Sequence, residues 1–137
     1  MSRQIDERLA KVPLFSECRK RDLSFISAIV RDRSFPAGTE LTIEDQPGDE
    51  FMIILDGTVT ARRRGQELAQ LGPGDFFGEI ALLDGGPRTA TITADTPVTV
   101  GIIGRREWQD LLAQPGVAEK ILKALAQRIH AAEPTTL

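Results

Sequence analysis

Residues that build metal centres and covalent crosslinks are scarce in this chain. Its 137 residues include one cysteine, Cys18, and one histidine, His130. A single cysteine excludes an internal disulfide and favours a reducing compartment. With one cysteine, one histidine and no cluster of three acidic residues, the sequence offers no set of ligands for a metal ion. No serine or cysteine has a candidate base nearby either, so neither metal-assisted nor nucleophilic catalysis is predicted, and we expect no enzyme.

Long hydrophobic runs and an excess of positive charge are also lacking. No segment approaches 18 uninterrupted apolar residues, so no membrane span is predicted. The first eight residues contain no apolar run, which argues against a signal peptide. The net charge is −3, so no overall positive field favours nucleic acid or an anionic membrane. Together these absences predict a cytoplasmic protein.

Periodicity predicts a single domain over residues 1–137, built in three parts. Residues 1–30 carry apolar side chains at helical spacing, and Ser16 is a candidate cap for a new helical turn. Residues 105–132 return to this spacing, with helices expected over 105–113 and 115–132. The second of these helices has an apolar stripe of Ala118, Ile121, Leu122, Leu125 and Ile129.

Between these helices, over residues 31–103, short apolar segments alternate with turn residues. Seven or eight strands at a spacing of 8–12 residues favour a sandwich or barrel over βαβ units. The predicted fold is mainly β (α+β), an antiparallel β-roll or double-stranded jelly roll flanked by N- and C-terminal helices. Asp56-Gly57 predicts a hairpin between strands at 50–55 and 58–64. Alternation of polar and apolar residues predicts a half-buried strand over 88–94.

The segment over residues 74–90 carries the chemistry. After Gly78, residues 79–83 are long enough for one helical turn, whose N-terminus offers unpaired N–H groups to an anion. Arg88 supplies a fork of donors suited to phosphate, and Glu79 supplies an acceptor for hydroxyl groups. On the residues alone a structural alternative stays open, in which Glu79 stabilises the helix N-terminus and pairs with Arg88.

These residues resemble the phosphate-binding cassette of the cyclic-nucleotide-binding domain family. The sequence reads Phe-Gly-Glu-Ile-Ala-Leu-Leu over residues 77–83, then a gap of three residues, then Pro-Arg-Thr-Ala over 87–90. The resemblance extends upstream to the turn at 36–38, to Gly48-Asp49, to the strand at 51–55, and to Gly57 and Val59. It therefore covers nearly the whole chain and implies a cassette over residues 76–90.

The resemblance assigns a role to each matching residue. It implies that Glu79 accepts a hydrogen bond from the ribose 2′-hydroxyl and that Arg88 binds the cyclic phosphate. Thr89 is expected to reach the phosphate or the exocyclic amine of a syn guanine. Leu71 and Val59 either line the purine or belong to the ordinary core of the roll. The complete expected ligand-binding set is Gly78, Glu79, Ile80, Ala81, Arg88, Thr89, Leu71 and Val59.

The function implied is that of a receptor module for cAMP or cGMP, without a cofactor, that signals through its C-terminal helix to a protein partner. The family's transcription factors carry a helix-turn-helix after the last helix, but only five residues follow it here, so no direct DNA binding is expected. The alternatives are a non-catalytic interaction module of the same fold that binds no nucleotide and, third, an enzyme of the cupin type. The oligomeric state stays open.

Four further features each allow two interpretations. Cys18 is a candidate redox sensor or an ordinary thiol, and the run Arg62-Arg63-Arg64 is a solvated hairpin or a contact for a partner. Trp108, at helical spacing from two leucines, packs in the core or stacks on the purine. His130 is a surface residue or touches the purine edge.

Overall fold

The computed structural model describes residues 7–78 and 87–132, without the side chains of residue 125 and residues 127–132. The chain forms two compact units. One is helical and takes residues 1–29 and 109–137; the other is rich in strands and takes residues 30–108. None of the helices in the described ranges has the length and hydropathy of a membrane span.

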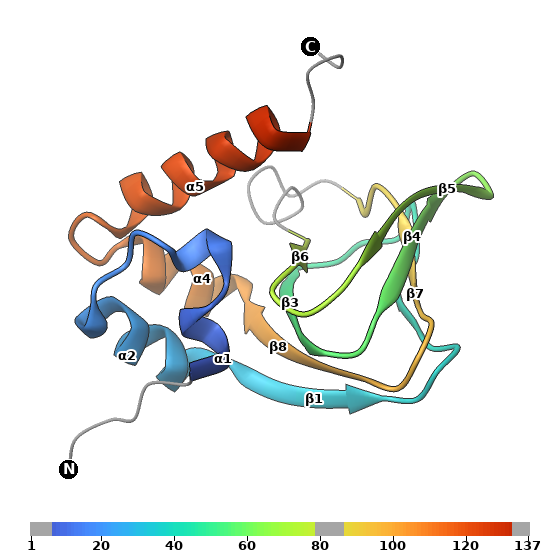
Figure 1. The fold of residues 1–137 in the computed structure, drawn as a ribbon, viewed down its shortest axis with the longest axis horizontal. Helices are drawn as coiled ribbons and strands as arrows, with labels where there is room; N and C mark the ends of the chain where they lie inside the picture. The colour runs from blue at the N-terminus through green and yellow to red at the C-terminus, as the bar shows by residue number, and fades with distance from the viewer. Residues whose placement is uncertain (1–6, 79–86, 133–137) are drawn as a thin grey trace. The chain divides into compact units, whose positions relative to one another are not determined.

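The strand-rich unit contains two four-stranded antiparallel sheets (Figure 1). Their orders are β1-β8-β3-β6 and β2-β7-β4-β5. This arrangement confirms the predicted antiparallel β-roll. The strands are β1 (Arg31–Phe35), β2 (Glu40–Thr42), β3 (Glu50–Asp56), β4 (Val59–Arg63), β5 (Gln66–Leu71), β6 (Phe76–Phe77), β7 (Thr91–Ala94) and β8 (Val98–Gly104).

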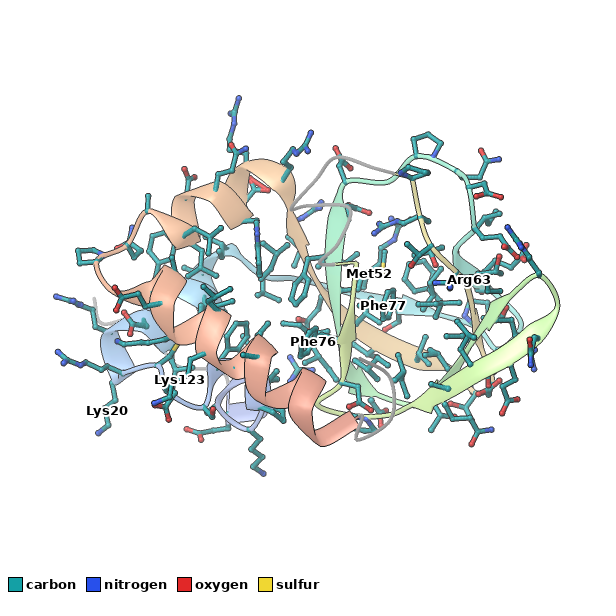
Figure 2. The ribbon with its side chains drawn as sticks, turned by 90° about the horizontal axis from the view of Figure 1, so that it is seen from above. Lys20, Met52, Arg63, Phe76, Phe77 and Lys123 are labelled. Carbon is teal, nitrogen blue, oxygen red and sulfur yellow. The ribbon has the colours of Figure 1, made fainter. Side chains whose placement is uncertain are left out.

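Apolar side chains from both sheets meet in one core. In β7 the buried residues Ile92 and Ala94 alternate with partly exposed threonines, as a half-buried strand requires. Met52 of β3 stands opposite Phe77 of β6, and both side chains are labelled in Figure 2. The core cluster consists of Met52, Ile54, Val59, Ala61, Phe77, Ile92, Ala94, Val98, Val100 and Ile102. Burial of this apolar surface is the main force that holds the two sheets together.

The hairpin predicted at Asp56-Gly57 is wrong. β3 and β4, on either side of it, belong to different sheets, so the chain crosses from one layer to the other there. Gly57 makes the crossing with a φ of +89°, and an added Cβ would overlap the carbonyl oxygen of Pro97. The glycine therefore serves a sheet crossing with positive φ and close backbone approach, which local sequence does not distinguish from a tight hairpin.

A tight hairpin does occur one strand later, between β4 and β5. Its turn residues, Arg64 and Gly65, have φ angles of 53° and 77°, which is the left-handed pair of a type I′ turn. The Arg64 N–H donates to the Glu44 carboxylate at 2.9 and 3.2 Å. The hairpin interpretation of the run Arg62-Arg63-Arg64 is therefore confirmed.

The strand predicted over residues 88–94 begins later, at Thr91. Residues 88–90 precede it in irregular conformation, and their carbonyl groups are bound by donors outside any strand ladder. This departure matters for function, because it frees Arg88 from the alternation that a strand would impose on it.

The helical unit contains α1 (Glu7–Ala10), the 3-10 turn η1 (Pro13–Phe15), α2 (Lys20–Ile29) and α5 (Val117–Ala132). Helix α4 (Arg105–Leu112) has residues in both units. The prediction of Ser16 as a helix cap is wrong, since Ser16 follows η1 and donates its N–H to the Pro13 carbonyl. The carboxylate of Asp22 takes the capping role instead and accepts the Arg19 N–H at 3.0 Å.

Helix α5 agrees with the predicted stripe at Ile121 and departs from it at Ala118 and Leu122. Val117, Ile121 and Ala124 are buried, whereas Ala118 is exposed and Leu122 is 68% exposed. Leu125 and Ile129, the rest of the predicted stripe, lie outside the side chains that the structure describes. Two ion pairs also hold α5 within its unit. Lys120 pairs with Asp22 at 2.8 Å, and Lys123, labelled in Figure 2, pairs with Glu17 at 3.3 Å.

Candidate functional site

A buried arginine stands at the centre of the candidate site. Arg88 is only 8% exposed, and its Nη2 donates to the backbone carbonyl of Glu50 at 2.8 Å. Burial lowers the pKa of Arg88, while the negative charges of Glu50 and Asp49 act in the opposite direction. An arginine side chain nevertheless stays protonated in proteins, so the site contains a permanent, partly desolvated positive charge.

Two glycines make room for this guanidinium. A Cβ added at Gly48 would overlap the Nε of Arg88. A Cβ added at Gly78 would lie 2.8 Å from Nη1 of Arg88 and 2.6 Å from the Glu50 carbonyl. Gly78 also has a φ of +96°, a conformation that glycine adopts without strain. The position of Arg88 thus depends on the lack of side chains at residues 48 and 78.

The backbone around Arg88 is held by hydrogen bonds from several segments. Asp45 donates its N–H to the Arg88 carbonyl at 2.8 Å, and Arg88 donates its own N–H to the Gln46 carbonyl at 2.9 Å. The next two carbonyls, of residues 89 and 90, accept from Arg63 Nε at 2.8 Å and from Thr42 Oγ1 at 2.9 Å. Three consecutive carbonyls are therefore fixed by three different donors, in a segment that has no strand partner.

One donor of Arg88 is left without a partner. Its Nη1 is buried and makes no hydrogen bond within the part of the chain that the structure describes. An unpaired buried donor costs about 1–3 kcal/mol, and more when the group is charged. A ligand with an anionic oxygen would satisfy this donor through a short, charge-assisted hydrogen bond. The arrangement at Arg88 therefore fits a phosphate group.

The other predicted site residues lie in different surroundings. Thr89 is exposed and follows Arg88 directly. Val59 is fully buried in the core cluster, and Leu71, its register partner on β5, packs against the same cluster. Glu79, Ile80 and Ala81 lie outside the described residues. The structure therefore brings together Arg88, Thr89 and Gly78, while Val59 has the surroundings of a core residue.

Sequence reasoning missed the partners on the other side of Arg88. Gln46 and Gly48 before β3, with Glu50 at its start, supply two carbonyl acceptors and a space free of side chains, but the sequence does not indicate that these groups face Arg88. Neither interpretation of the run Arg62-Arg63-Arg64, a solvated hairpin or a contact for a partner, predicts that the Arg63 guanidinium donates to the Thr89 carbonyl. Pairings of this kind join residues 26 to 42 positions apart, and local patterns do not encode them.

The structure bears on two of the open interpretations. Trp108 is buried, and its ring lies 4.7 Å from that of Phe51, so it belongs to the core of the strand-rich unit. Cys18 is partly buried; burial, and then the charge of Asp22, raises the pKa of its thiol to about 11. A thiol with so high a pKa contains little thiolate at neutral pH, which disfavours the redox-sensor interpretation. The side chain of His130 lies outside those described.

Clusters of candidate metal ligands are absent from the described residues. No group of three or more His, Cys, Asp and Glu side chains within them is placed to hold a metal ion.

Comparison with known proteins gives one family. Residues 32–115 match the family model of the cyclic nucleotide-binding domain. The CRP-like cAMP-activated global transcriptional regulator of Mycobacterium tuberculosis is 33% identical over 132 residues, which cover 92% of this chain and 59% of the regulator. The cAMP-dependent protein kinase regulatory subunit of Neurospora crassa is 33% identical over 123 residues, covering 88% of this chain and 31% of the subunit. The chain thus spans less than two thirds of the length of both relatives.

A solved structure gives a match over nearly the full length of both chains. The N-terminal domain of a transcriptional regulator from Streptomyces coelicolor is 32% identical, with a TM-score of 0.79. The match covers 96% of this chain and 99% of that domain.

Proposed function

Because the chain belongs to the cyclic nucleotide-binding domain family, we propose that it is a receptor module for cAMP or cGMP, without catalytic activity of its own. The observation that carries the proposal is the buried Nη1 of Arg88, a charged donor with no partner among the described residues. A cyclic phosphodiester carries one negative charge, which matches a single arginine. The Mycobacterium tuberculosis relative, whose name describes it as cAMP-activated, supports cAMP as the first ligand to test.

In this proposal Arg88 binds the cyclic phosphate, helped by backbone N–H groups near Gly78, Ile80, Ala81 and Thr89. Glu79 accepts a hydrogen bond from the ribose 2′-hydroxyl. Leu71 contributes apolar surface toward the purine, and Val59 supports it from the core. The module acts as one domain over residues 1–137, in which the roll of residues 31–103 carries the cassette of residues 76–90.

Isothermal titration calorimetry with cAMP and cGMP tests the proposal directly. We expect micromolar or tighter binding by the parent protein. Arg88→Ala removes a charge-assisted contact of about 1.5–3 kcal/mol, so the dissociation constant rises roughly 10- to 150-fold. Arg105→Ala, at an exposed position of α4, is the matched control and should bind as the parent does. A parent protein that binds neither nucleotide would instead favour the interaction module that keeps the fold.

The role of Glu79 has its own test. Glu79→Ala should weaken cAMP by a similar factor but leave the affinity for 2′-deoxy-cAMP nearly unchanged, because that ligand lacks the hydroxyl. Equal losses for the two ligands would remove the proposed contact.

We further propose that the bound state is signalled through α5 to a protein partner. A ligand shifts such a helix only by the difference in its affinity for the two positions of the helix. Hydrogen exchange with and without cAMP should show slower exchange over residues 119–131 on binding. Equal protection in both states would mean that α5 does not respond to the ligand.

A further inference from the structure

Arg63 is the last residue of β4, at the end where the strand passes from buried to exposed residues. β4 pairs with β7 in unbroken register, from Val59 opposite Ala94 to Arg62 opposite Thr91. Since side chains alternate between the faces of a strand, Arg63 shares its face with Val59 and Ala61, both members of the core cluster. By this alternation Arg63 lies on the same face of β4 as Val59 and Ala61, and Arg62 lies on the opposite face, at an end of the strand where Arg62 is partly exposed and Arg63 is exposed.

The side chain of Arg63 continues the β4–β7 pairing where the ladder ends. The residue next in register on the other strand, Ala90, lies before the start of β7. Arg63 Nε donates to the Thr89 carbonyl at 2.8 Å. This side-chain hydrogen bond holds residues 88–90 in place where backbone hydrogen bonds between β4 and β7 have ended. Figure 2 labels this arginine among the side chains of the strand-rich unit. The bond ties β4 to the residue directly after Arg88.

The hydrogen bond to the Thr89 carbonyl uses one of the five N–H donors of the Arg63 guanidinium. A guanidinium carries one donor on Nε and four on its two Nη atoms. For the Nη atoms of Arg63 the described residues provide no hydrogen bond or ion pair, and the residue is exposed. Arg62, in contrast, has an acidic neighbour, with its Nη2 lying 3.9 Å from the Glu67 carboxylate. Within the described residues, Arg63 therefore keeps its charge and its Nη donors unpaired beside Thr89.

The backbone beneath Arg63 is also well fixed. Its neighbour Arg64 occupies the two-residue turn and donates its N–H to the Glu44 carboxylate. Glu44 in turn donates its own N–H to Thr91 Oγ1 at 3.0 Å. A cation held on such a hairpin loses little conformational freedom when it meets an anion, which favours binding.

We propose that Arg63 is a second arginine of the anion site, which positions Thr89 and adds positive charge that strengthens the binding of the cyclic phosphate held by Arg88. This inference rests on the proposed function. It makes Arg63 a determinant of affinity in addition to Arg88, with a contribution that depends on salt because the side chain is exposed.

Three variants separate charge from position. Arg63→Gln removes the charge of Arg63, and Arg63→Lys keeps it. Arg62→Gln removes a charge from the opposite face of the same strand. Calorimetry with cAMP at about 50 mM and about 500 mM NaCl gives the readout, since attraction between exposed charges is largely screened at the higher concentration. Thermal unfolding of each variant without ligand checks that the fold is intact.

At low salt we expect Arg63→Gln to bind about three- to tenfold more weakly than the parent, with a smaller gap at high salt. Arg63→Lys should recover part of the loss, and Arg62→Gln should bind within about twofold of the parent. If Arg63→Gln and Arg62→Gln bind alike, the inference is overturned while the receptor function stands. The contribution of charge is overturned if Arg63→Lys binds cAMP as weakly as Arg63→Gln and the loss of affinity is the same at both salt concentrations. Absence of binding by the parent overturns the receptor function and this inference together.

Discussion

Replacement of Gly48 by alanine tests whether the position of Arg88 controls binding. The φ angle of Gly48 lies outside the left-handed region, so alanine can adopt the same backbone conformation. The three atoms nearest to the added Cβ, Nε, Cζ and Nη2, all belong to the guanidinium of Arg88. The substitution therefore acts on one side chain and leaves the backbone without strain.

The magnitude follows from what Arg88 would have to give up. To clear the new methyl group, the guanidinium must leave its position, and Nη2 loses the 2.8 Å hydrogen bond to Glu50. A ligand would also lose its charge-assisted contact with Arg88, which is worth about 1.5–3 kcal/mol. We expect the dissociation constant for cAMP to rise roughly 10- to 150-fold. The free energy of unfolding should fall by about 1–3 kcal/mol, the usual cost of overpacking.

A double-mutant cycle makes the test specific. In the Arg88→Ala background, Gly48→Ala should have almost no further effect on affinity, because the side chain it displaces is already gone. Gly72→Ala is the matched control, since its Cβ would meet only Thr58 Cγ2 at 4.0 Å. The reasoning would be refuted if Gly48→Ala bound cAMP as tightly as the parent. It would also be refuted if Gly48→Ala reduced the affinity by the same factor in the Arg88→Ala background as in the parent.

Three further predictions concern other parts of the chain. Burial would raise the pKa of Asp22, but hydrogen bonds from Lys120 and the Arg19 N–H outweigh it and lower the pKa overall. The ionised carboxylate therefore stabilises the fold above about pH 4, and this stabilisation is lost as the pH falls through the pKa of the folded state. Asp22→Asn should thus cost about 1–3 kcal/mol at pH 7 and flatten the acid limb of urea-unfolding stability measured against pH; an unchanged limb would contradict this. Cys18, with a thiol pKa of about 11 against an ordinary 9.0, should react with iodoacetamide at pH 7 roughly 100-fold more slowly in the folded than in the unfolded protein. The affinities for cAMP and cGMP should differ by less than about tenfold, and Thr89→Ala should weaken cGMP more than cAMP in parallel titrations.

The sequence predicts the fold class well because the roll follows from strand patterns and turn residues that are local. It predicts the alternation of Ile92 and Ala94 correctly for the same reason. It fails at Gly57, where a positive φ serves a crossing between sheets, since a hairpin and a crossing need the same residue. It also fails at Leu122, because helical spacing alone does not say which of several apolar positions turns inward.

For the candidate site, the sequence predicts the central arginine but not its surroundings. Arg88 is recognisable because residues 77–90 resemble the phosphate-binding cassette of the family, whereas the residues alone leave a structural pairing with Glu79 open. Its partners, from the carbonyl of Glu50 to the space above Gly48, come from a loop about 40 residues earlier. Backbone carbonyls carry no side-chain signature, so no pattern of residue types reveals which of them will accept a hydrogen bond.

The geometry around Arg88 also relates binding to stability. The carbonyls of residues 88–90 are already held by Asp45, Arg63 and Thr42, so the segment needs little ordering when an anion arrives. The buried Nη1 is the opposite case, because it has no hydrogen-bond partner among the described residues, and a buried donor without a partner lowers the stability of the folded protein. A phosphate that satisfies this donor relieves the penalty only in the folded state, where the donor is buried. The same hydrogen bond to Nη1 therefore contributes to ligand binding and to the stability of the folded protein. At the same ligand concentration, cAMP should raise the unfolding temperature of the parent protein more than that of Arg88→Ala.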